Sequence, residues 1–338
     1  MKYNYVLLST DWDVYRQFYS DVLHRDDVCY VAGPQASKRG LEKLLYRAHF
    51  NKKLNRLVQL PFKGLWNRSY FTNPFKNDKP LCFVLFRDWV SLDAYTGYIS
   101  WLKKHYPNSR FVWFLHDLMA THVDFYTGRT LDIDRCKRDL DLVVSCNPTE
   151  AAKYQLFYHS VPLSKLCGDG NGDRCDVLFI GKDKGRMERL LRIYDALTQK
   201  GGRCRFFISE VSNPDLAGSG REGITFLDRP MSYKDCQSWI SGSKCLLELR
   251  YDPVAGPTMR VSEALLFGKK LITDNPVWAD GAGFDPALIR VLGPGDDTER
   301  IDLPFMTAVP DIPPHTREAV RRRLSPATFL EELDAILP

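Results

Sequence analysis

Residues 246–275 read LLELRYDPVAGPTMRVSEALLFGKKLITDN and decide the fold. The stretch completes a buried strand, CLLEL, passes through a polar turn containing Pro and Gly, and opens a helix near Thr258. A second apolar strand, KLIT, follows Gly268. Strand, helix and strand in this order are typical of an α/β sheet. The turn brings backbone N–H groups, Arg260 and Glu263 to the start of a helix, where an anion is held most easily.

The same alternation of apolar strand and amphipathic helix extends in both directions from this stretch. Helical spacing is expected over residues 13–24, 91–107 and 233–243, and after Pro148 and Arg186. Strands are expected at KYNYVLLST, VCYVAG, CFVLFRDW, FVWFLHDL, LVVSC, DVLFI, RCRFFIS, ITFLD, CLLEL, KLIT and IRVL.

A chain of 338 residues exceeds the size at which single cores stop growing, so two domains are expected. The polar, Gly-rich residues 168–173 are the best linker, which predicts domains at 1–167 and 174–338. Ser325 can cap a final helix that has Pro326 at its first position. This last helix is a candidate to return to the first domain.

Composition narrows the class of protein. Apolar residues make up 44% and charged residues 26% of the chain, as in a globular protein. The N-terminus has no signal-peptide core and no window reaches the roughly 18 apolar residues of a membrane span, which predicts a cytoplasmic protein. The nine cysteines include no C-x-x-C pair, so neither a zinc site nor disulfides are expected.

Positive charge is concentrated in the first half of the chain. Residues 38–68 hold nine Lys or Arg against the single acid Glu42, and they include an apolar stripe of leucines. One interpretation is a basic amphipathic surface for anionic lipid or a polyprenyl diphosphate. The other is an ordinary helix that packs its stripe on the core and exposes a basic face. Nucleic acid is not expected, because no nucleic-acid motif accompanies the charge.

Charged pairs follow the strands of the first half. Arg87 and Asp88 end one apolar run, and His116 and Asp117 end the next. Asp11 follows the first strand. In an open parallel sheet, ligands bind outside the carboxyl ends of the strands, so these residues are candidates for a site.

The loop GKDKGR, residues 181–186, follows a strand and opens a helix. Gly181, Lys182, Lys184 and Arg186 would therefore meet backbone N–H groups at a helix N-terminus, an arrangement that suits a diphosphate. The loop is neither a Walker A loop nor a dinucleotide fingerprint. A charged strand-to-helix turn without a ligand is the alternative.

The opening stretch supplies a second loop of this kind. Glu263 could accept both hydroxyls of a ribose, Arg260 could face phosphate, and Gly256 would let the backbone approach a ligand closely. The alternative is a simple cap, in which Thr258 or Ser262 caps the helix and Glu263 lies in its first turn. Two such loops in one domain favour the functional interpretation.

Together these segments resemble a known family. DVLFIGKDKGR, SYKDCQSWISGSKCLLELRYD, GPTMRVSEALLFGKKLITDN and SPATFLEEL look like bacterial GT-B glycosyltransferases of capsular polysaccharide and lipopolysaccharide synthesis. RAHFNKKLNRLVQLPFKGLW and SLDAYTGYISWLKKHYPNSRFVWFLHD resemble the same group in the first half. The resemblance implies an α/β, GT-B fold of two Rossmann-like domains facing a central cleft, with the acceptor in the first domain and the nucleotide sugar in the second.

The resemblance also implies roles in donor binding. Glu263 would bind the ribose, and Arg260 with the backbone of Gly256, Thr258 and Met259 would bind the diphosphate. The loop of residues 181–186 would close over the diphosphate. Arg229 and Met231 would lie near the base, and Arg250 is a further phosphate candidate. No metal and no cofactor are implied beyond the nucleotide sugar as co-substrate.

One position departs from the family. Many retaining members carry a Glu eight positions before the ribose-binding Glu, where this chain has Ala255. The difference favours inversion, which needs a general base on the acceptor. His116 and Asp117 are the first choice, because His can accept a proton near neutral pH and a nearby carboxylate could orient its ring. Asp88 and Asp11 are the alternatives.

The expected function is transfer of a sugar from a nucleotide sugar to a lipid-linked or growing glycan acceptor in surface polysaccharide synthesis. The enzyme would be cytoplasmic or peripheral at the inner face of the plasma membrane. Two alternatives stay open: a nucleotide-sugar epimerase or hydrolase on the same fold, and a non-catalytic nucleotide-sugar-binding subunit. The strings DWD and DID could suggest a metal-dependent GT-A enzyme, but two tandem sheet domains argue against that fold.

Overall fold

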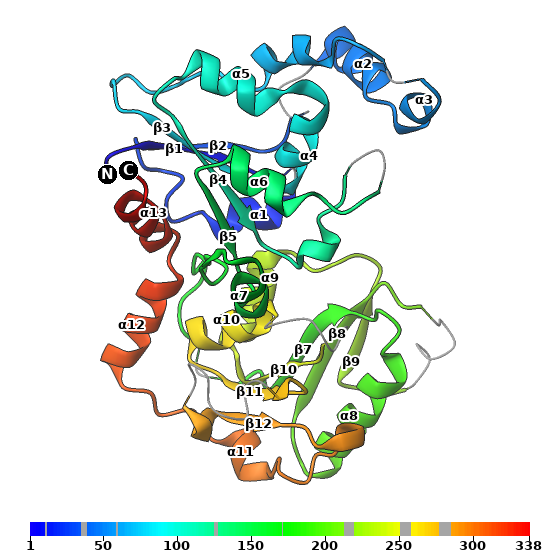
Figure 1. Ribbon diagram of the computed structural model, residues 1–338. Coiled ribbons are helices and arrows are strands. Elements are labelled where there is room, and N and C mark those ends of the chain that lie inside the picture. The colour runs from blue at the N-terminus through cyan, green and yellow to red at the C-terminus, as the bar shows by residue number, and fades with distance from the viewer. Residues whose placement is uncertain are drawn as a thin grey trace. The chain divides into compact units, whose positions relative to one another are not determined.

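The computed structural model describes residues 1–10, 12–34, 39–58, 60–124, 128–170, 172–212, 220–250, 258–276 and 285–338. The chain forms two compact units, shown in Figure 1. Unit 1 comprises residues 1–164 together with 325–338, and unit 2 comprises residues 165–324. Each unit contains one sheet of six strands with helices packed against it.

The sheet of unit 1 is parallel throughout, in the order β2-β1-β3-β4-β5-β6. Its central strands are uniformly buried, because helices cover both faces and leave no alternation of apolar and polar residues. The strands are β1 (Asn4–Leu8), β2 (Val28–Val31), β3 (Leu81–Leu85), β4 (Arg110–Leu115), β5 (Leu142–Ser145) and β6 (Phe157–Tyr158).

Two expected helices of unit 1 are shorter than the sequence pattern indicates. The helix expected over residues 13–24 ends at Phe18, and turns follow. The helix expected over 91–107 is interrupted at Gly97, whose φ of 59° is left-handed and ends one helix where the next begins. The helices of unit 1 are α1 (Asp13–Phe18), α2 (Gly40–His49), α3 (Lys52–Leu57), η1 (Lys63–Ser69), α4 (Arg87–Thr96), α5 (Tyr98–His105), η2 (Met119–Thr121), α6 (Ile133–Asp139), α7 (Pro148–Tyr154) and α13 (Pro326–Ile336).

The final helix, α13, belongs to unit 1 although it follows unit 2 in sequence. The Ser325 side chain caps it by accepting a hydrogen bond from the Ala327 N–H at 3.1 Å. Tyr5 of β1 donates its hydroxyl to the Leu330 carbonyl at 3.0 Å, and Phe329 is fully buried. The two ends of the chain therefore lie side by side in Figure 1.

The sheet of unit 2 is also parallel, in the order β12-β11-β10-β7-β8-β9. The chain enters at β7 in the middle, builds to the β9 edge, and then returns to β10 on the other side of β7. The strand order therefore reverses between β7 and β10. The strands are β7 (Cys175–Lys182), β8 (Cys204–Ser209), β9 (Ile224–Leu227), β10 (Ser243–Glu248), β11 (Lys270–Thr273) and β12 (Ile289–Val291).

The helices of unit 2 connect these strands and complete its core. α8, α9 and α10 begin near the residues that the sequence pattern indicates, whereas α11 and α12 were not anticipated. The helices are α8 (Met187–Gln199), α9 (Tyr233–Ser241), α10 (Met259–Phe267), η5 (Pro286–Leu288), η6 (Pro294–Asp296), α11 (Leu303–Thr307) and α12 (Pro314–Leu324). Among the helices described in either unit, none has the length and apolar composition needed to cross a bilayer.

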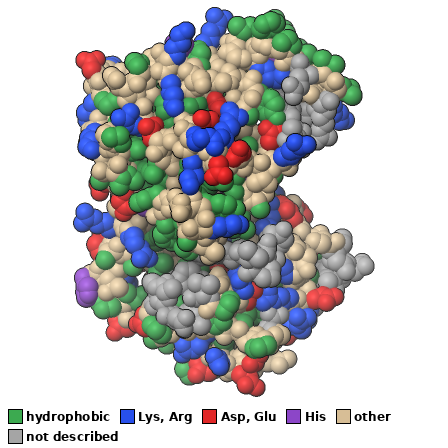
Figure 2. All heavy atoms as spheres, viewed as in Figure 1, with side chains coloured by type: hydrophobic (Ala, Val, Ile, Leu, Met, Phe, Trp, Pro, Cys, Tyr) green, Lys and Arg blue, Asp and Glu red, His purple; other side chains and the backbone are tan. Residues whose placement is uncertain are grey.

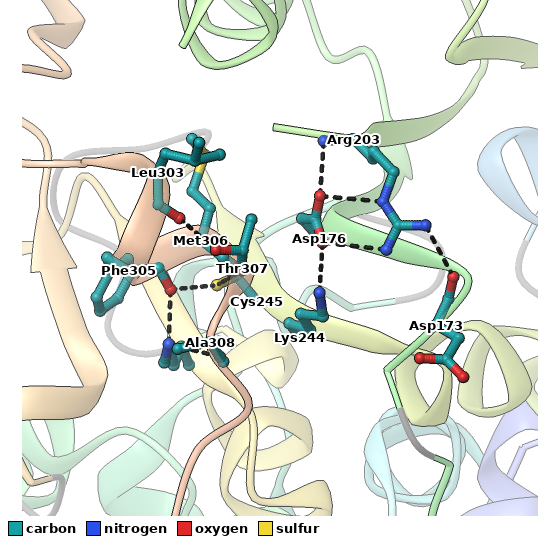
Figure 3. A network of polar contacts seen from close by, with 11 residues as sticks. Asp173, Asp176, Arg203, Lys244, Cys245, Leu303, Phe305, Met306, Thr307 and Ala308 are labelled. Atoms are coloured by element: carbon teal, nitrogen blue, oxygen red, sulfur yellow. Dashed lines mark hydrogen bonds and ion pairs between the residues drawn. The ribbon is translucent and has the colours of Figure 1, made fainter. Parts of the chain in front are cut away.

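A buried carboxylate joins three segments at the amino end of the second sheet. Asp176 of β7 accepts hydrogen bonds from the Arg203 guanidinium at 3.2 Å and from the Lys244 ammonium at 2.8 Å, as Figure 3 shows. Burial alone would raise the pKa of Asp176, but these two partners outweigh it and lower the pKa. On β11, Lys270 donates to the Phe305 carbonyl of α11 at 2.6 Å. These hydrogen bonds and ion pairs link β7, β10 and β11 to the neighbouring segments of unit 2.

Candidate functional site

In unit 2, the strand order reverses between β7 and β10. The carboxyl ends of these two strands are therefore the place to look for a ligand site. Loops leave the sheet in opposite directions at such a point and open a crevice, which is where α/β sheets bind ligands. The loop of residues 181–186 leaves β7 at this place, and Arg250 follows β10. Two of the segments singled out by the sequence therefore meet at one edge of the sheet.

Arg186 links the loop after β7 to the residue that follows β10. Its guanidinium donates to the Asp183 carbonyl at 3.2 Å, to the Lys182 carbonyl at 3.0 Å and to the Leu249 carbonyl beyond β10. Burial lowers the pKa of Arg186, but a guanidinium remains charged at neutral pH. Arg186 therefore supplies positive charge to the edge while its N–H groups hold the loop.

Two further arginines contact Asp274, which directly follows β11. Arg189 of α8 lies 2.8 Å from its Oδ2 atom, and the Arg250 backbone N–H donates to Oδ1 at 2.9 Å. The Arg250 guanidinium also donates to the Asp274 carbonyl at 3.0 Å. Arg189 and Arg250 thus contact the Asp274 carboxylate, and Arg186 lies within electrostatic range of Asp274 and of the buried Asp183. Three guanidinium groups and two carboxylates leave a net positive charge at this edge.

The tip of the 181–186 loop adds two lysines. Lys182 forms an ion pair of 2.6 Å with Glu210, and both side chains are exposed to solvent. Lys184 is exposed on a left-handed backbone with φ of 50°, and Gly185 follows with φ of 76°. Consecutive left-handed residues turn the chain sharply from Gly181 into α8. The loop has the N–H groups and cations that hold a phosphate.

The start of α10 is organised by a residue that the sequence analysis did not single out. Glu248, the last residue of β10, is buried and accepts a hydrogen bond from the Thr258 N–H at 2.9 Å and from the Thr273 hydroxyl at 2.5 Å. Burial raises the pKa of Glu248, although these hydrogen bonds oppose the shift. An acid within the otherwise apolar run CLLEL is the signal that could have revealed it.

Thr258 caps α10, as in the alternative interpretation of this stretch, with its hydroxyl accepting from the Arg260 N–H at 3.2 Å. Glu263 lies in the second turn of the helix instead of the first, and Met259 is the first helical residue. Glu263 is fully buried and pairs with Arg260 at 2.7 Å. Burial raises the pKa of Glu263 despite the arginine. A ribose could reach this carboxylate only if the pair opened.

Of the remaining residues predicted to bind the donor, two lie in the turn after β9 and one lies outside the described residues. Arg229 is exposed and Met231 is half-buried in the turn that follows β9 and leads to α9. β9 is the edge strand, separated from β7 by β8. Gly256 lies outside the described residues, as do Ala255 and the rest of 251–257.

The sheet of unit 1 reverses its strand order between β1 and β3. Asp88 lies in the first turn of α4, directly after β3, and Arg87 is 3.4 Å from it. The Trp89 indole donates to the Ser9 carbonyl beyond β1 at 2.6 Å, which fixes the start of α4 at this point. Asp11 lies outside the described residues.

His116 follows β4, the neighbour of β3, and packs among aromatic rings. The centroid of its ring lies 4.6 Å from that of Tyr15 and 5.3 Å from that of Phe86. Burial lowers the pKa of His116 to about 4; the Phe114 backbone opposes this shift and Arg87 adds to it. A neutral imidazole with this pKa is a weak base at pH 7.

Asp117 does not orient the His116 ring, contrary to the expectation from the sequence. Its carboxylate accepts the N–H of Leu118 at 2.8 Å, and the residue is exposed. Its backbone carbonyl lies 3.2 Å from Nε2 of His122, a fully buried residue whose pKa burial lowers to about 3. Glu150 of α7 accepts the Met119 N–H through both oxygens, at 3.0 and 2.9 Å, and so fixes the turn. An exposed carboxylate thus stands on a rigid turn.

Comparison with known proteins supports the architecture. No protein-family model and no curated protein matches the sequence. Among solved structures, the chain is similar to a UDP-forming trehalose-phosphate synthase from Burkholderia vietnamiensis, with a TM-score of 0.54, 11% identity, and coverage of 99% of this chain and 98% of that chain. A sucrose-phosphate synthase from Thermosynechococcus elongatus gives a TM-score of 0.53 and 12% identity, over 98% of this chain and 97% of that one.

A further trehalose-6-phosphate synthase, studied for glycosyl transfer with retention, has a TM-score of 0.52 and 12% identity, over 99% of this chain and 100% of that chain. These neighbours are GT-B glycosyltransferases. The chain therefore has the GT-B fold, with two parallel six-stranded α/β sheets, and the fold expected from the sequence is confirmed.

Proposed function

We propose that the protein is a metal-independent glycosyltransferase that moves a sugar from a nucleotide-sugar donor to a lipid-linked or growing glycan acceptor in surface polysaccharide synthesis, on the cytoplasmic side of the membrane. The observation that carries this proposal is the arginine cluster at the strand reversal of unit 2. Arg189 and Arg250 pair with Asp274, and Arg186 ties the loop after β7 to the Leu249 carbonyl, at the place where such sheets bind ligands.

A nucleoside diphosphate fits the charge of this edge. Phosphate oxygens are bound by guanidinium groups and by N–H groups at helix starts. Arg189, Lys182 and Lys184 reach the edge from the loop and the first turn of α8. The same cations would stabilise the diphosphate as it leaves with its developing charge, which is work that a metal ion performs in other transferases.

The other donor contacts follow from the family resemblance. When the donor binds, the pair of Arg260 and Glu263 would open. The Glu263 carboxylate would then accept hydrogen bonds from the ribose hydroxyls, and the Arg260 guanidinium would contact a phosphate. Arg229 and Met231 would contact the base. The buried pair of Arg260 and Glu263 makes these roles conditional on a local rearrangement when the donor binds.

The acceptor hydroxyl needs a general base if the reaction inverts, and we propose inversion because Ala255 stands where many retaining enzymes carry Glu. Asp117 is the preferred base among the described candidates, since it is exposed on a fixed turn. Asp88 is paired with Arg87, and His116 is a weak base. His116 would then shape the edge instead of taking the proton.

Thermal unfolding with UDP, GDP, CMP and ADP compounds tests donor binding. A ligand present at 100 times its dissociation constant stabilises the folded state by about 2.7 kcal/mol, which is easily seen as a rise in Tm. No shift with any of these compounds would refute the proposal. Full activity in excess EDTA is expected, and loss of activity would show that a metal is required.

Product analysis separates the enzyme classes. Incubation with donor alone should leave it intact, whereas an epimerase or hydrolase would convert it. With an acceptor present, NMR of the new glycosidic bond gives its anomeric configuration. A product that keeps the donor configuration would overturn inversion and leave the glycosyltransferase assignment in place.

A further inference from the structure

Eight large apolar side chains of unit 1 are exposed within one short segment. They lie on α2, α3 and the following turn into η1, and between 41% and 84% of each is exposed. Figure 2 shows hydrophobic side chains gathered over the α2 and α3 region. We call this set the leucine surface: Leu41, Leu44, Leu45, Leu54, Leu57, Val58, Phe62 and Leu65. Monomeric proteins rarely leave so many contiguous apolar groups in water without a partner for them.

α2 has two apolar faces, and the core uses only one of them. Tyr46 is 2% exposed and packs against Phe50, Trp66 and Tyr70, with ring centroids 4.5, 5.4 and 6.2 Å away. Leu41, Leu44 and Leu45 lie on a different face because their spacing follows the helical repeat. The stripe therefore does not pack on the core, which contradicts one of the two interpretations of this segment.

Hydrogen bonds hold the outer part of the leucine surface in place. Asn55 is buried, with its side-chain amide donating to the His49 and Asn51 carbonyls at 2.9 Å each. Nε2 of His49 donates to the Pro61 carbonyl at 2.7 Å, and Nδ1 accepts the Trp66 indole N–H at 2.8 Å. The apolar side chains are thus presented by a structured scaffold.

Phe62 is the most unusual member of the surface. Its backbone has a φ of 60°, a left-handed conformation that costs free energy for a bulky residue. Its side chain is nevertheless 76% exposed, so burial of the ring within unit 1 does not offset this cost. Uncommon backbone conformations of this kind concentrate at binding surfaces.

Cations accompany the leucine surface on the same segment. Residues 38–68 contain nine Lys or Arg and one acid. Lys43 and Arg47 of α2 and Lys53 of α3 are exposed. Long basic side chains can extend toward headgroups while neighbouring leucines enter the apolar boundary of a bilayer. A second copy of the chain would be a poor partner, because a symmetric contact would bring the same cations together.

We propose that the leucine surface inserts into the interface of an anionic lipid membrane, with Lys43, Arg47 and Lys53 contacting the negatively charged headgroups. The inference deepens the proposed function by naming the surface that would bring the enzyme to a lipid-linked acceptor. It stands on the exposure and charge of this segment, so it can be tested without donor or acceptor.

The test is sedimentation of the full chain with vesicles of phosphatidylcholine alone and with vesicles that also contain phosphatidylglycerol. Binding is expected to the anionic vesicles and to weaken as salt is raised. Leu44→Gln/Leu45→Gln should weaken binding by roughly 100-fold, because two inserted side chains become polar. Lys43→Gln/Arg47→Gln/Lys53→Gln should weaken it by about 100-fold through loss of headgroup attraction.

Matched variants in unit 2 control for apolar area and charge. Val309→Gln removes an exposed apolar side chain, and Arg322→Gln/Arg323→Gln removes exposed cations, and both should bind vesicles like the wild type. Vesicle binding that is absent, or unchanged in the leucine and lysine variants, would overturn the inference. So would a concentration-dependent dimer in sedimentation velocity that Leu44→Gln/Leu45→Gln abolishes.

Thermal shifts with nucleotides, measured on the same preparations, keep the two proposals apart. Variants that lose vesicle binding but keep the nucleotide shift support the leucine surface as a membrane contact. A wild-type protein that binds vesicles but shows no nucleotide shift would refute the proposed function and leave the membrane interface standing.

Discussion

The carboxyl edges of the two sheets occupy equivalent places in the fold but carry opposite chemistry. In unit 1, the edge at β3 and β4 is lined by aromatic rings, two histidines held neutral by burial, and the carboxylates of Asp88 and Asp117. In unit 2, the edge at β7, β10 and β11 carries Arg186, Arg189 and Arg250, two of which pair with Asp274. We propose that the first edge accepts a proton and that the second holds an anion.

The difference teaches that topology locates a site without deciding its chemistry. Both sheets reverse their strand order, which creates a place where loops diverge. The first loops then contribute a carboxylate on a rigid turn, and the second contribute guanidinium groups tied to backbone carbonyls. Sugar transfer needs both, since a hydroxyl must lose a proton and a diphosphate must leave.

The largest expected effect comes from removing the proposed base of the first edge. Asp117→Asn should lower kcat by about 10³-fold, because general base catalysis contributes on the order of 10²–10⁴. The nucleotide-induced rise in Tm should persist, since we propose that the donor binds at the second edge. Steady-state kinetics and thermal shift on the same variant measure the two separately.

Asp88→Asn is the matched variant for this prediction, because Asp88 lies on the neighbouring strand end but is paired with Arg87. A much smaller loss is expected from it. If Asp117→Asn retained full activity, the assignment of the base to this turn would be wrong.

The amino end of the second sheet is expected to affect the stability of unit 2 and not its binding of the donor. Asp176→Asn should lower the free energy of unfolding by about 3 kcal/mol at pH 7, because it leaves Lys244 without its buried partner. The pKa of Asp176 is lowered in the folded protein, so its contribution is present above its ordinary pKa and is lost as pH falls through the folded value.

Urea unfolding of wild type and Asp176→Asn at several pH values checks this behaviour. The two curves should converge on acidification. Donor affinity should be unchanged, because the network lies at the opposite end of the strands from the arginine cluster. A large loss of donor affinity in a folded variant would show that the two ends are not independent.

Removing one arginine of the second edge should weaken donor binding. Arg189→Gln is expected to raise the Kd of the nucleotide sugar by about 10- to 100-fold, as for the loss of a charge-assisted phosphate contact. Arg192→Gln removes an exposed arginine one turn away on α8 and serves as the control. Equal effects of the two variants in isothermal titration would mean that only overall charge matters.

The smallest expected effect concerns the carboxylate beneath α10. Glu248→Gln preserves hydrogen-bonding groups at Thr258 and Thr273, so the unfolding free energy at low pH should change by less than about 1 kcal/mol. The raised pKa of Glu248 means that the folded state holds its proton longer than the unfolded state does. Stability should therefore fall as pH rises from the ordinary pKa of Glu to the raised value.

Glu248→Gln should remove this part of the pH dependence, which urea unfolding of both proteins between pH 4 and 8 would measure. Identical slopes in wild type and variant would show that Glu248 titrates normally in the folded protein.

Much of the fold could be read from local patterns. The apolar runs CLLEL and KLIT became adjacent parallel strands, and the Pro148 and Pro326 helices begin where expected. Such features depend on neighbouring residues, so periodicity and capping report them. The long helix across Gly97 was wrong, since a single left-handed glycine changes direction without disturbing the apolar spacing on either side.

Only part of the candidate site could be predicted from the sequence. Arg186 and Arg250 were identified as cations at strand ends, but the bond from Arg186 to the Leu249 carbonyl and the bond from Arg250 to Asp274 each join segments more than 20 residues apart. Arg189, Glu248 and His122 were missed for the same reason. The exposure of the stripe on α2 could not be known either, because an amphipathic pattern does not say whether its apolar face meets a core or the outside.

The sequence by itself determined the α/β class, the two sheets and the residues able to hold a proton or a phosphate, because periodicity, caps and residue type are local properties. Only the tertiary structure decided which charges are neutralised. It paired Glu263 with Arg260, packed His116 among rings, and placed Arg189 and Arg250 against Asp274. These outcomes depend on burial and distance, which arise when strands distant in sequence meet in one sheet.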